Sequence, residues 1–85
     1  MIMPTIHSNG TSAESLREQY VSAHHAADAA MKAVAKIDFN GRDYYPQGAD
    51  AFSQAQAEFQ KHVQAMATSM KYFMDVAMHC DKFCK

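Results

Sequence analysis

The chain has few of the residues that mark several large classes of protein. Glycine occurs three times, proline twice and cysteine twice in 85 residues. Two cysteines do not make the disulfide framework of a small secreted domain, so we expect the protein in a reducing cytoplasm. No apolar run approaches the ~18 residues of a membrane span. The N-terminus also lacks the basic region and long apolar core of a signal peptide.

An excess of charge of one sign is also missing. Lys and Arg number 8 and Asp and Glu number 9, which gives a formal net charge of -1. This balance argues against a protein that binds a nucleic acid polymer, which needs a dense basic face to neutralise phosphates. The hydrophobic fraction of 48% is too high for a disordered chain, and the length predicts a single domain over residues 1–85.

Glycine and proline are absent from two long intervals that are rich in helix-forming residues. The pattern predicts four segments: an N-terminal arm over 1–10, a helix over 12–38, a loop over 39–48 and a helix over 50–82. Thr11 followed by Glu14 matches a capping box, and Asp50 is a good N-cap for the second helix. The predicted fold class is all-α, an antiparallel two-helix hairpin with an ordered arm.

Each predicted helix carries an apolar stripe whose members are three or four residues apart. In the first helix the stripe is Leu16, Tyr20, Ala23, Ala27, Ala30, Val34 and Ile37. In the second helix it is Phe52, Ala55, Phe59, Val63, Met66, Met70, Phe73, Ala77, Cys80 and Cys84. The end of the second helix is apolar on most sides, because it carries a further set: Tyr72, Met74, Val76, Met78 and Phe83.

This surplus of apolar surface predicts self-assembly. Two antiparallel helices cannot enclose a core, and an isolated hairpin would leave a large apolar patch in water. A symmetric homo-oligomer covers such a patch, with a dimeric four-helix bundle as the simplest case. Alternatively, the Met-rich end of the second helix folds against the arm through Ile2, Met3 and Ile6.

The loop over 39–48 is longer than a helix hairpin needs. It holds one of the two arginines and two of the four tyrosines in the chain. Asn40-Gly41 suits a turn with positive φ, and Pro46 biases Tyr45 towards an extended backbone. The loop is therefore predicted to be ordered.

The residue types of this loop suit a small anionic ligand that contains rings. Arg42 carries a planar fork of donors that matches phosphate oxygens, and Tyr44 and Tyr45 offer aromatic faces for stacking. We predict that Asp43 accepts hydrogen bonds from ribose hydroxyls, and that Asn40 and Gln47 bind a base edge. Alternatively, the two tyrosines only cap the end of the bundle, and Arg42 pairs with Asp38 or Asp43.

The arm contributes two further candidate contacts, His7 and Asn9, to the ligand or to a partner chain. They lie in a compact polar segment directly before the first helix. The alternative is a capping arrangement, in which Ile6 packs while Ser8, Asn9 and Thr11 satisfy amides at the helix start.

The arm segment PTIHSNGTS and the loop segment NGRDYYPQG, followed by ADAFSQAQAEFQ, resemble a family of small proteins encoded by tailed phages and prophages. The resemblance covers Pro4 to about His62. Small oligomeric phage proteins of this kind resemble sponges for nucleotide immune signals, such as the cyclic ADP-ribose derivatives of Thoeris defence or the cyclic oligonucleotides of CBASS. The resemblance implies action in the host bacterial cytoplasm against anti-phage defence.

Cys80 and Cys84 share a helix face beside His79, but a closed zinc site takes four ligands and one chain supplies two at useful spacing. We interpret both cysteines as small core residues, and predict no metal and no cofactor. The sequence has no nucleophile elbow, P-loop or dinucleotide fingerprint, so it predicts no enzyme.

The predicted function is therefore the non-enzymatic binding of a small nucleotide-type ligand by a homo-oligomer, with pockets near subunit boundaries. The rival is a protein-interaction module, either a phage inhibitor of a host protein or a minor structural component. The first hypothesis requires Arg42 and the tyrosines to converge on a concave site. The second predicts that the tyrosines and the Met-rich surface stay exposed.

Overall fold

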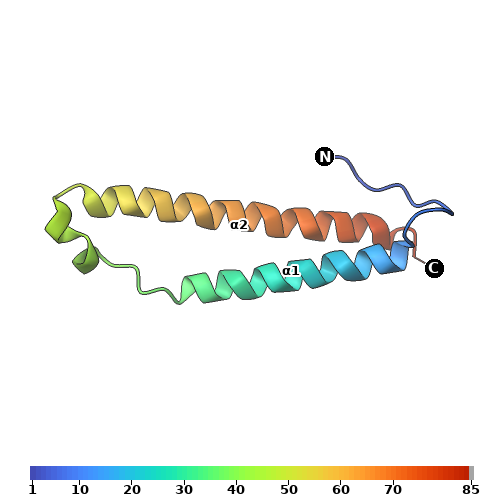
Figure 1. Ribbon diagram of the computed structural model, residues 1–85, viewed down its shortest axis with the longest axis horizontal. Helices are drawn as coiled ribbons and strands as arrows, with labels where there is room; N and C mark the ends of the chain where they lie inside the picture. The colour runs from blue at the N-terminus through green and yellow to red at the C-terminus, as the bar shows by residue number, and fades with distance from the viewer. Residues whose placement is uncertain (85) are drawn as a thin grey trace.

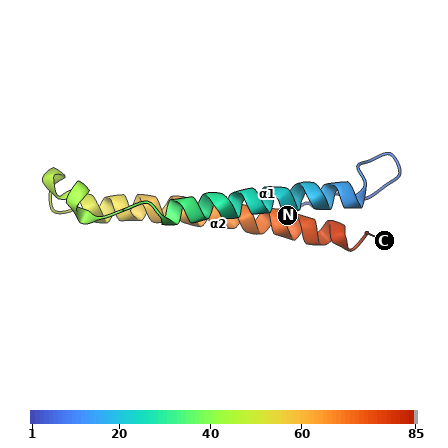
Figure 2. The ribbon, with the colours of Figure 1, turned by 90° about the horizontal axis from the view of Figure 1, so that it is seen from below.

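The computed structural model describes residues 1–84 as two long helices with a structured connection. Helix α1 spans Ala13–Ala35 and helix α2 spans Ala51–Asp81, and two 3₁₀ turns lie between them, η1 at Gly41–Asp43 and η2 at Tyr45–Gln47. Figures 1 and 2 show α1 and α2 side by side and antiparallel, in a molecule that measures 61 × 22 × 17 Å. The prediction of an all-α two-helix hairpin is confirmed.

The start of α1 differs from the prediction, because Ser12 and not Thr11 is its N-cap. Ser12 has an extended backbone, and its side-chain oxygen accepts a hydrogen bond from the amide of Ser15 at 3.1 Å. The capping box predicted from Thr11 and Glu14 is therefore wrong. Glu14 lies instead in the first turn, where a carboxylate is favoured by the positive end of the helix dipole.

The end of α1 also differs, since the helix stops at Ala35 and not at residue 38. The amide of Lys36 bonds to the carbonyls of Ala33 and Val34, which tightens the last turn. Residues 36–38 then leave the helix axis and carry the chain towards α2.

The turn into α2 is made by Gly48. Its φ of 124° is the one positive value in the described chain, and this backbone conformation favours glycine. The positive φ predicted at Asn40-Gly41 is therefore wrong. The predicted position of Asp50 at the N-cap of α2 is confirmed, but its backbone is already helical and its side chain makes no capping hydrogen bond.

The two helices pack along one apolar seam. Every member of the stripe predicted for α2, from Phe52 to Cys84, is half-buried or buried. In α1 the stripe fails at Ala30 and Ile37, which are exposed, while Met31 is half-buried between the positions of Ala27 and Val34. A helix has 3.6 residues per turn, so steps of four and three from Ala27 reach Met31 and Val34 on the seam.

Burial is greatest at the end of the hairpin where the arm returns to α2. The buried residues of the described chain all lie there: Ala13, Val76, Ala77 and Cys80. The Nε2 of His79 donates a hydrogen bond to the carbonyl of Pro4 at 2.9 Å, which holds the arm against the last turns of α2. Arg17 adds a link between the helices through an ion pair with Asp81 at 2.9 Å.

The arm covers only part of the apolar surplus on α2. Met3 and Ile6 are half-buried, whereas Ile2 is 93% exposed. The packing of the arm proposed from the sequence is therefore wrong for Ile2, whereas Met3 and Ile6 are partly covered. Large apolar side chains near the end of α2 remain exposed: Tyr72, Met78 and Phe83.

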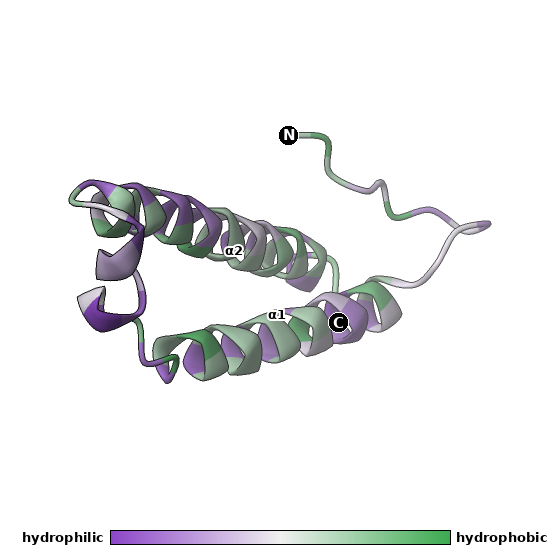
Figure 3. Ribbon diagram, turned by 60° about the vertical axis from the view of Figure 1, so that its left-hand side comes forward, coloured by the Kyte–Doolittle hydropathy of each residue, from purple (hydrophilic) through white to green (hydrophobic). Residues whose placement is uncertain are grey.

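Polar residues interrupt the apolar stretches along both helices. Figure 3 shows hydrophobic and hydrophilic residues alternating around α1 and α2, while the η1 turn is strongly hydrophilic. Within residues 1–84, no helix combines the length and the hydropathy that crossing a membrane requires.

We predict that Val76→Ala lowers the free energy of unfolding by about 2 kcal/mol, because it removes fully enclosed methyl groups and leaves a cavity. Urea denaturation followed by circular dichroism measures the change. Ile2→Ala serves as the control and should change stability by less than about 0.5 kcal/mol, since that side chain is exposed. Equal effects of the two substitutions would contradict the packing of this end.

Candidate functional site

Phe39 organises the connection between the helices. Its ring stacks on Phe59 with the two ring centroids 4.7 Å apart, and it lies 5.5 Å from the rings of both Phe52 and Tyr44. Phe52 and Tyr44 complete the group at 6.0 Å. This aromatic cluster (Phe39, Tyr44, Phe52 and Phe59) fixes the loop on the first turns of α2.

Asn40 shapes the η1 turn through its side chain. Its Oδ1 accepts a hydrogen bond from the amide of Arg42 at 3.0 Å, and its Nδ2 donates to the carbonyl of Asp38 at 3.2 Å. Both ends of the Asn40 amide therefore bond within the loop. Asparagine is favoured at such positions because its short side chain substitutes for a backbone turn partner.

Arg42 forms an ion pair with Asp38, with Nη2 and Oδ2 3.1 Å apart. This is the pairing that the sequence allowed as the alternative to a phosphate contact. Both side chains are largely exposed, at 74% and 80%, and ion pairs in water are weak and easily exchanged. The guanidinium is thus held at the surface of the loop by a partner that an anion of higher charge can displace.

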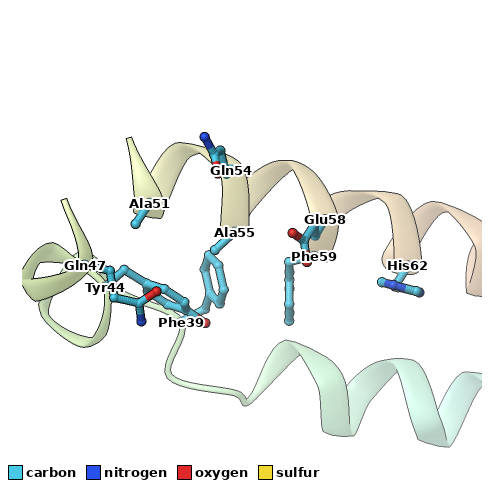
Figure 4. Close-up of a pocket in the computed structure, with 9 residues that line it drawn as sticks. All are labelled: Phe39, Tyr44, Gln47, Ala51, Gln54, Ala55, Glu58, Phe59 and His62. Carbon is cyan, nitrogen blue, oxygen red and sulfur yellow. The ribbon is translucent and has the colours of Figure 1, made fainter. Parts of the chain in front are cut away.

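A cavity of about 460 Å³ opens between the loop and the first turns of α2. Aromatic side chains form one part of its wall: Phe39, Tyr44 and Phe59. Polar side chains form another part: Gln47, Gln54, Glu58 and His62. Ala51 and Ala55 leave the space open, because small side chains at these two positions of α2 do not fill it. Figure 4 shows the aromatic side chains below α2 and the polar residues Gln54 and Glu58 along the helix.

The structure brings two of the predicted loop residues into this cavity, Tyr44 and Gln47. Arg42 and Asp43 are exposed outside its lining, and Tyr45 is 75% exposed. Within this chain, the predicted convergence of Arg42 with both tyrosines on one concave site is therefore wrong, because only Tyr44 of the three lines the cavity.

Sequence reasoning missed the residues that α2 and Phe39 contribute. Glu58 and His62 are one helical turn apart, and Gln54 lies one turn before Glu58, so all three share a flank of α2 next to the apolar stripe. That spacing was visible in the sequence. What was not visible is that the loop folds over this flank and not over another.

His7 and Asn9 lie at the opposite end of the elongated hairpin from the loop (Figure 1). A single chain therefore does not join the arm and the loop in one site. His7 instead lines a separate open cavity of about 520 Å³ with Ser8, Glu14 and Phe83. Its ring lies against Gly10, where a Cβ would be 2.8 Å from Nε2, so a larger residue there would require the exposed His7 side chain to move.

No family model, curated protein or solved structure matches the sequence. The candidate site is therefore described from its own geometry. In the part of the chain that the structure describes, no three His, Cys, Asp or Glu side chains gather closely enough to hold a metal ion.

The two cysteines occupy different environments at the end of α2. Cys80 is buried, and the loss of solvent raises the pKa of its thiol, with a smaller contribution from Cys84. Cys84 is half-buried, and its Sγ lies 3.6 Å from the carbonyl of Cys80, to which it donates. Both are free thiols.

We predict that a thiol-specific reagent at pH 8 modifies Cys84 well before Cys80, because burial disfavours the reactive thiolate of Cys80. Mass spectrometry of time points measures the order. Cys84→Ser leaves one thiol, which should react slowly in native protein and rapidly in urea. In the unfolded chain the Cys80 thiol has its ordinary pKa, so it loses its proton at a lower pH than in the folded protein. The free energy of unfolding should therefore also fall as the pH rises above the ordinary thiol pKa. Equal labelling rates in native protein would contradict this assignment.

Proposed function

We propose that this protein binds a small nucleotide-type ligand at the hairpin connection and sequesters it without turnover. The observation that carries the proposal is the cavity of about 460 Å³, which combines an aromatic wall with polar side chains. Its volume lies in the range of small-molecule sites, and such sites place a few polar groups among aromatic ones. The rings of Phe39 and Phe59 are stacked on each other 4.7 Å apart, so a base packs on the side of the aromatic cluster that faces the cavity, and each stacked base contributes roughly 1–3 kcal/mol.

The polar groups around the cavity supply the remaining contacts in this proposal. Gln47 and Gln54 offer amide donors and acceptors to a base edge. Arg42 exchanges its exposed partner Asp38 for a phosphate, whose oxygens match the guanidinium fork. Asp43, at the end of η1, and Tyr45, at the start of η2, are exposed and are available to the sugar.

The resemblance of the arm and loop segments supplies the biological setting. We propose that the ligand is a nucleotide immune signal, either a cyclic ADP-ribose derivative or a cyclic oligonucleotide, and that its capture in the host cytoplasm suppresses anti-phage defence. A protein that sequesters a signal acts by stoichiometric binding. It therefore requires a high affinity and enough copies per cell, and no catalysis.

Thermal unfolding with a panel of cyclic nucleotides and ADP-ribose derivatives tests this function. A ligand at about 100-fold excess over Kd should stabilise the native protein by about 2.7 kcal/mol per site. The shift should fall in Tyr44→Ala and Arg42→Ala. Arg17→Ala is the matched control, because it removes the other arginine at the far end of the hairpin. If every member leaves the melting temperature unchanged, the proposal fails.

We also propose that the hairpin assembles with further copies of itself. Four buried residues are a small core for the 84 that the structure describes. A second apolar cavity of about 270 Å³ lies between the helices, with Met31, Val34 and Met66 in its lining. Met78 is 60% exposed on α2. Burial of this surface against a second copy completes a helix-bundle core.

We predict that sedimentation at micromolar concentration gives a mass of two or more chains. Met78→Glu should reduce that mass while the helical circular dichroism signal remains, since the charge falls on a side chain that one copy leaves in water. Thr68→Glu, on an exposed position of the same helix, is the control. A wild-type protein that stays monomeric at every concentration would overturn self-assembly.

A second candidate function is the protein-interaction module. The observation in its favour is the exposure of Tyr45, at 75%, together with the position of Arg42 outside the cavity. Tyrosine and arginine are enriched at the energetic centres of protein interfaces. In this case no nucleotide shifts the melting temperature, and a host protein captured by the wild type is lost with Tyr45→Ala.

A further inference from the structure

We infer that Glu58 is a specificity-determining residue of the cavity and selects a base with two adjacent N–H donors, as on the guanine edge. The inference deepens the proposed function and rests on it. Of the two proposed ligand classes it favours guanine-containing cyclic oligonucleotides, because a cyclic ADP-ribose derivative carries adenine. It assigns the orientation of the ligand as well, with the base inside the cavity and the phosphates outside at Arg42.

The first step is the position of Glu58 beside the stacking surface. Glu58 directly precedes Phe59, and the Phe59 ring lies 4.7 Å from that of Phe39 with 23° between their planes. Figure 4 shows the Glu58 carboxylate next to Phe59 on the same turn of α2. These two rings stack on each other, so a base bound in the cavity packs against the side of the aromatic cluster that faces the cavity. Glu58 lines the same cavity, so an edge of that base can face this carboxylate.

The second step is that the Glu58 carboxylate has no partner among residues 1–84. The ion pairs of that region involve Asp28, Asp38, Asp75 and Asp81, and no hydrogen bond is formed by the Glu58 side chain. An ionised carboxylate only accepts hydrogen bonds, with two oxygens side by side. Its complement in a ligand is a pair of neighbouring N–H donors.

The third step is the sign of the charge. The lining of the cavity contains one carboxylate, Glu58, and one histidine, His62, but no Lys or Arg, whereas the loop guanidinium of Arg42 lies outside. A phosphate inside the cavity would be repelled by the Glu58 carboxylate. A phosphate outside the cavity, at the η1 turn, would be attracted by the Arg42 guanidinium. The charge pattern therefore places the base inward and the phosphate outward.

The base edges then differ in how well they suit Glu58. Guanine presents N1–H and the 2-amino group side by side, so both carboxylate oxygens accept. Adenine offers one amino group beside an acceptor nitrogen, and hypoxanthine keeps N1–H but lacks the 2-amino group. Gln54 and Gln47 are the neighbouring amides that remain for the other polar atoms of the base.

The experiment is a titration of the protein with guanosine, inosine and adenosine 5′-monophosphates, followed by calorimetry. Hydrogen bonds to charged groups are worth enough that GMP should bind about tenfold more tightly than IMP or AMP. Glu58→Gln should lose this preference while AMP binding changes little. Glu18→Gln, an exposed glutamate of α1, is the matched control.

The two possible failures are distinguishable. If the three nucleotides bind with equal affinity and Glu58→Gln changes nothing, the role of Glu58 is overturned and the proposed function stands. If none of them binds and no cyclic nucleotide or ADP-ribose derivative shifts the melting temperature, the proposed function is overturned together with this inference. Circular dichroism of Glu58→Gln confirms folding, since the substituted side chain is exposed.

Discussion

The packing of α1 against α2 along one apolar seam is the interaction on which the rest of the structure depends. Two helices bury one face each, so every other apolar side chain needs a further element to cover it. At one end the arm supplies that element, and there Val76 and Cys80 are fully enclosed. At the other end the connection supplies it through Phe39, whose ring packs on Phe52 and Phe59. The middle of the hairpin is covered by neither the arm nor the connection.

Phe39 links the fold to the candidate site. Because α1 stops at Ala35, the chain has room to cross to α2 and place this ring against Phe59. The same ring lines the cavity with Tyr44. The length of the loop, which exceeds what a helix hairpin needs, therefore has a structural cause as well as the proposed functional one. Asn40 and Gly48 shape this path, one through its side chain and the other through its backbone.

Charge is distributed unevenly around the cavity although the whole chain is nearly neutral. Glu58 belongs to the lining, while Arg42 and its partner Asp38 lie at the surface of the loop. A net charge of -1 thus conceals a local arrangement which, in the function that we propose, discriminates between the two ends of a nucleotide. The arm residues His7 and Asn9 lie too far along the hairpin to take part within one chain (Figure 1), so any role at this cavity belongs to assembly.

The sequence by itself determined the two helices and the α2 face that packs. Periodicity identifies a buried face because the side chains on it recur with the helical turn, whatever the partner is. It also pointed to Tyr44 and Gln47, two of the nine residues that line the cavity. It did not determine the cap at Ser12, where neighbouring hydroxyls compete and the local path of the arm decides.

Only the tertiary structure decided which residues meet at the loop. Phe39, Glu58 and His62 are ordinary members of a helix pattern or a loop until the chain folds back over one flank of α2. Arg42 likewise has several candidate partners in the sequence, and the η1 turn places Asp38 within reach. Periodicity constrains contacts along one helix, whereas a site is formed by the path of the loop between helices, which depends on side-chain packing across the hairpin.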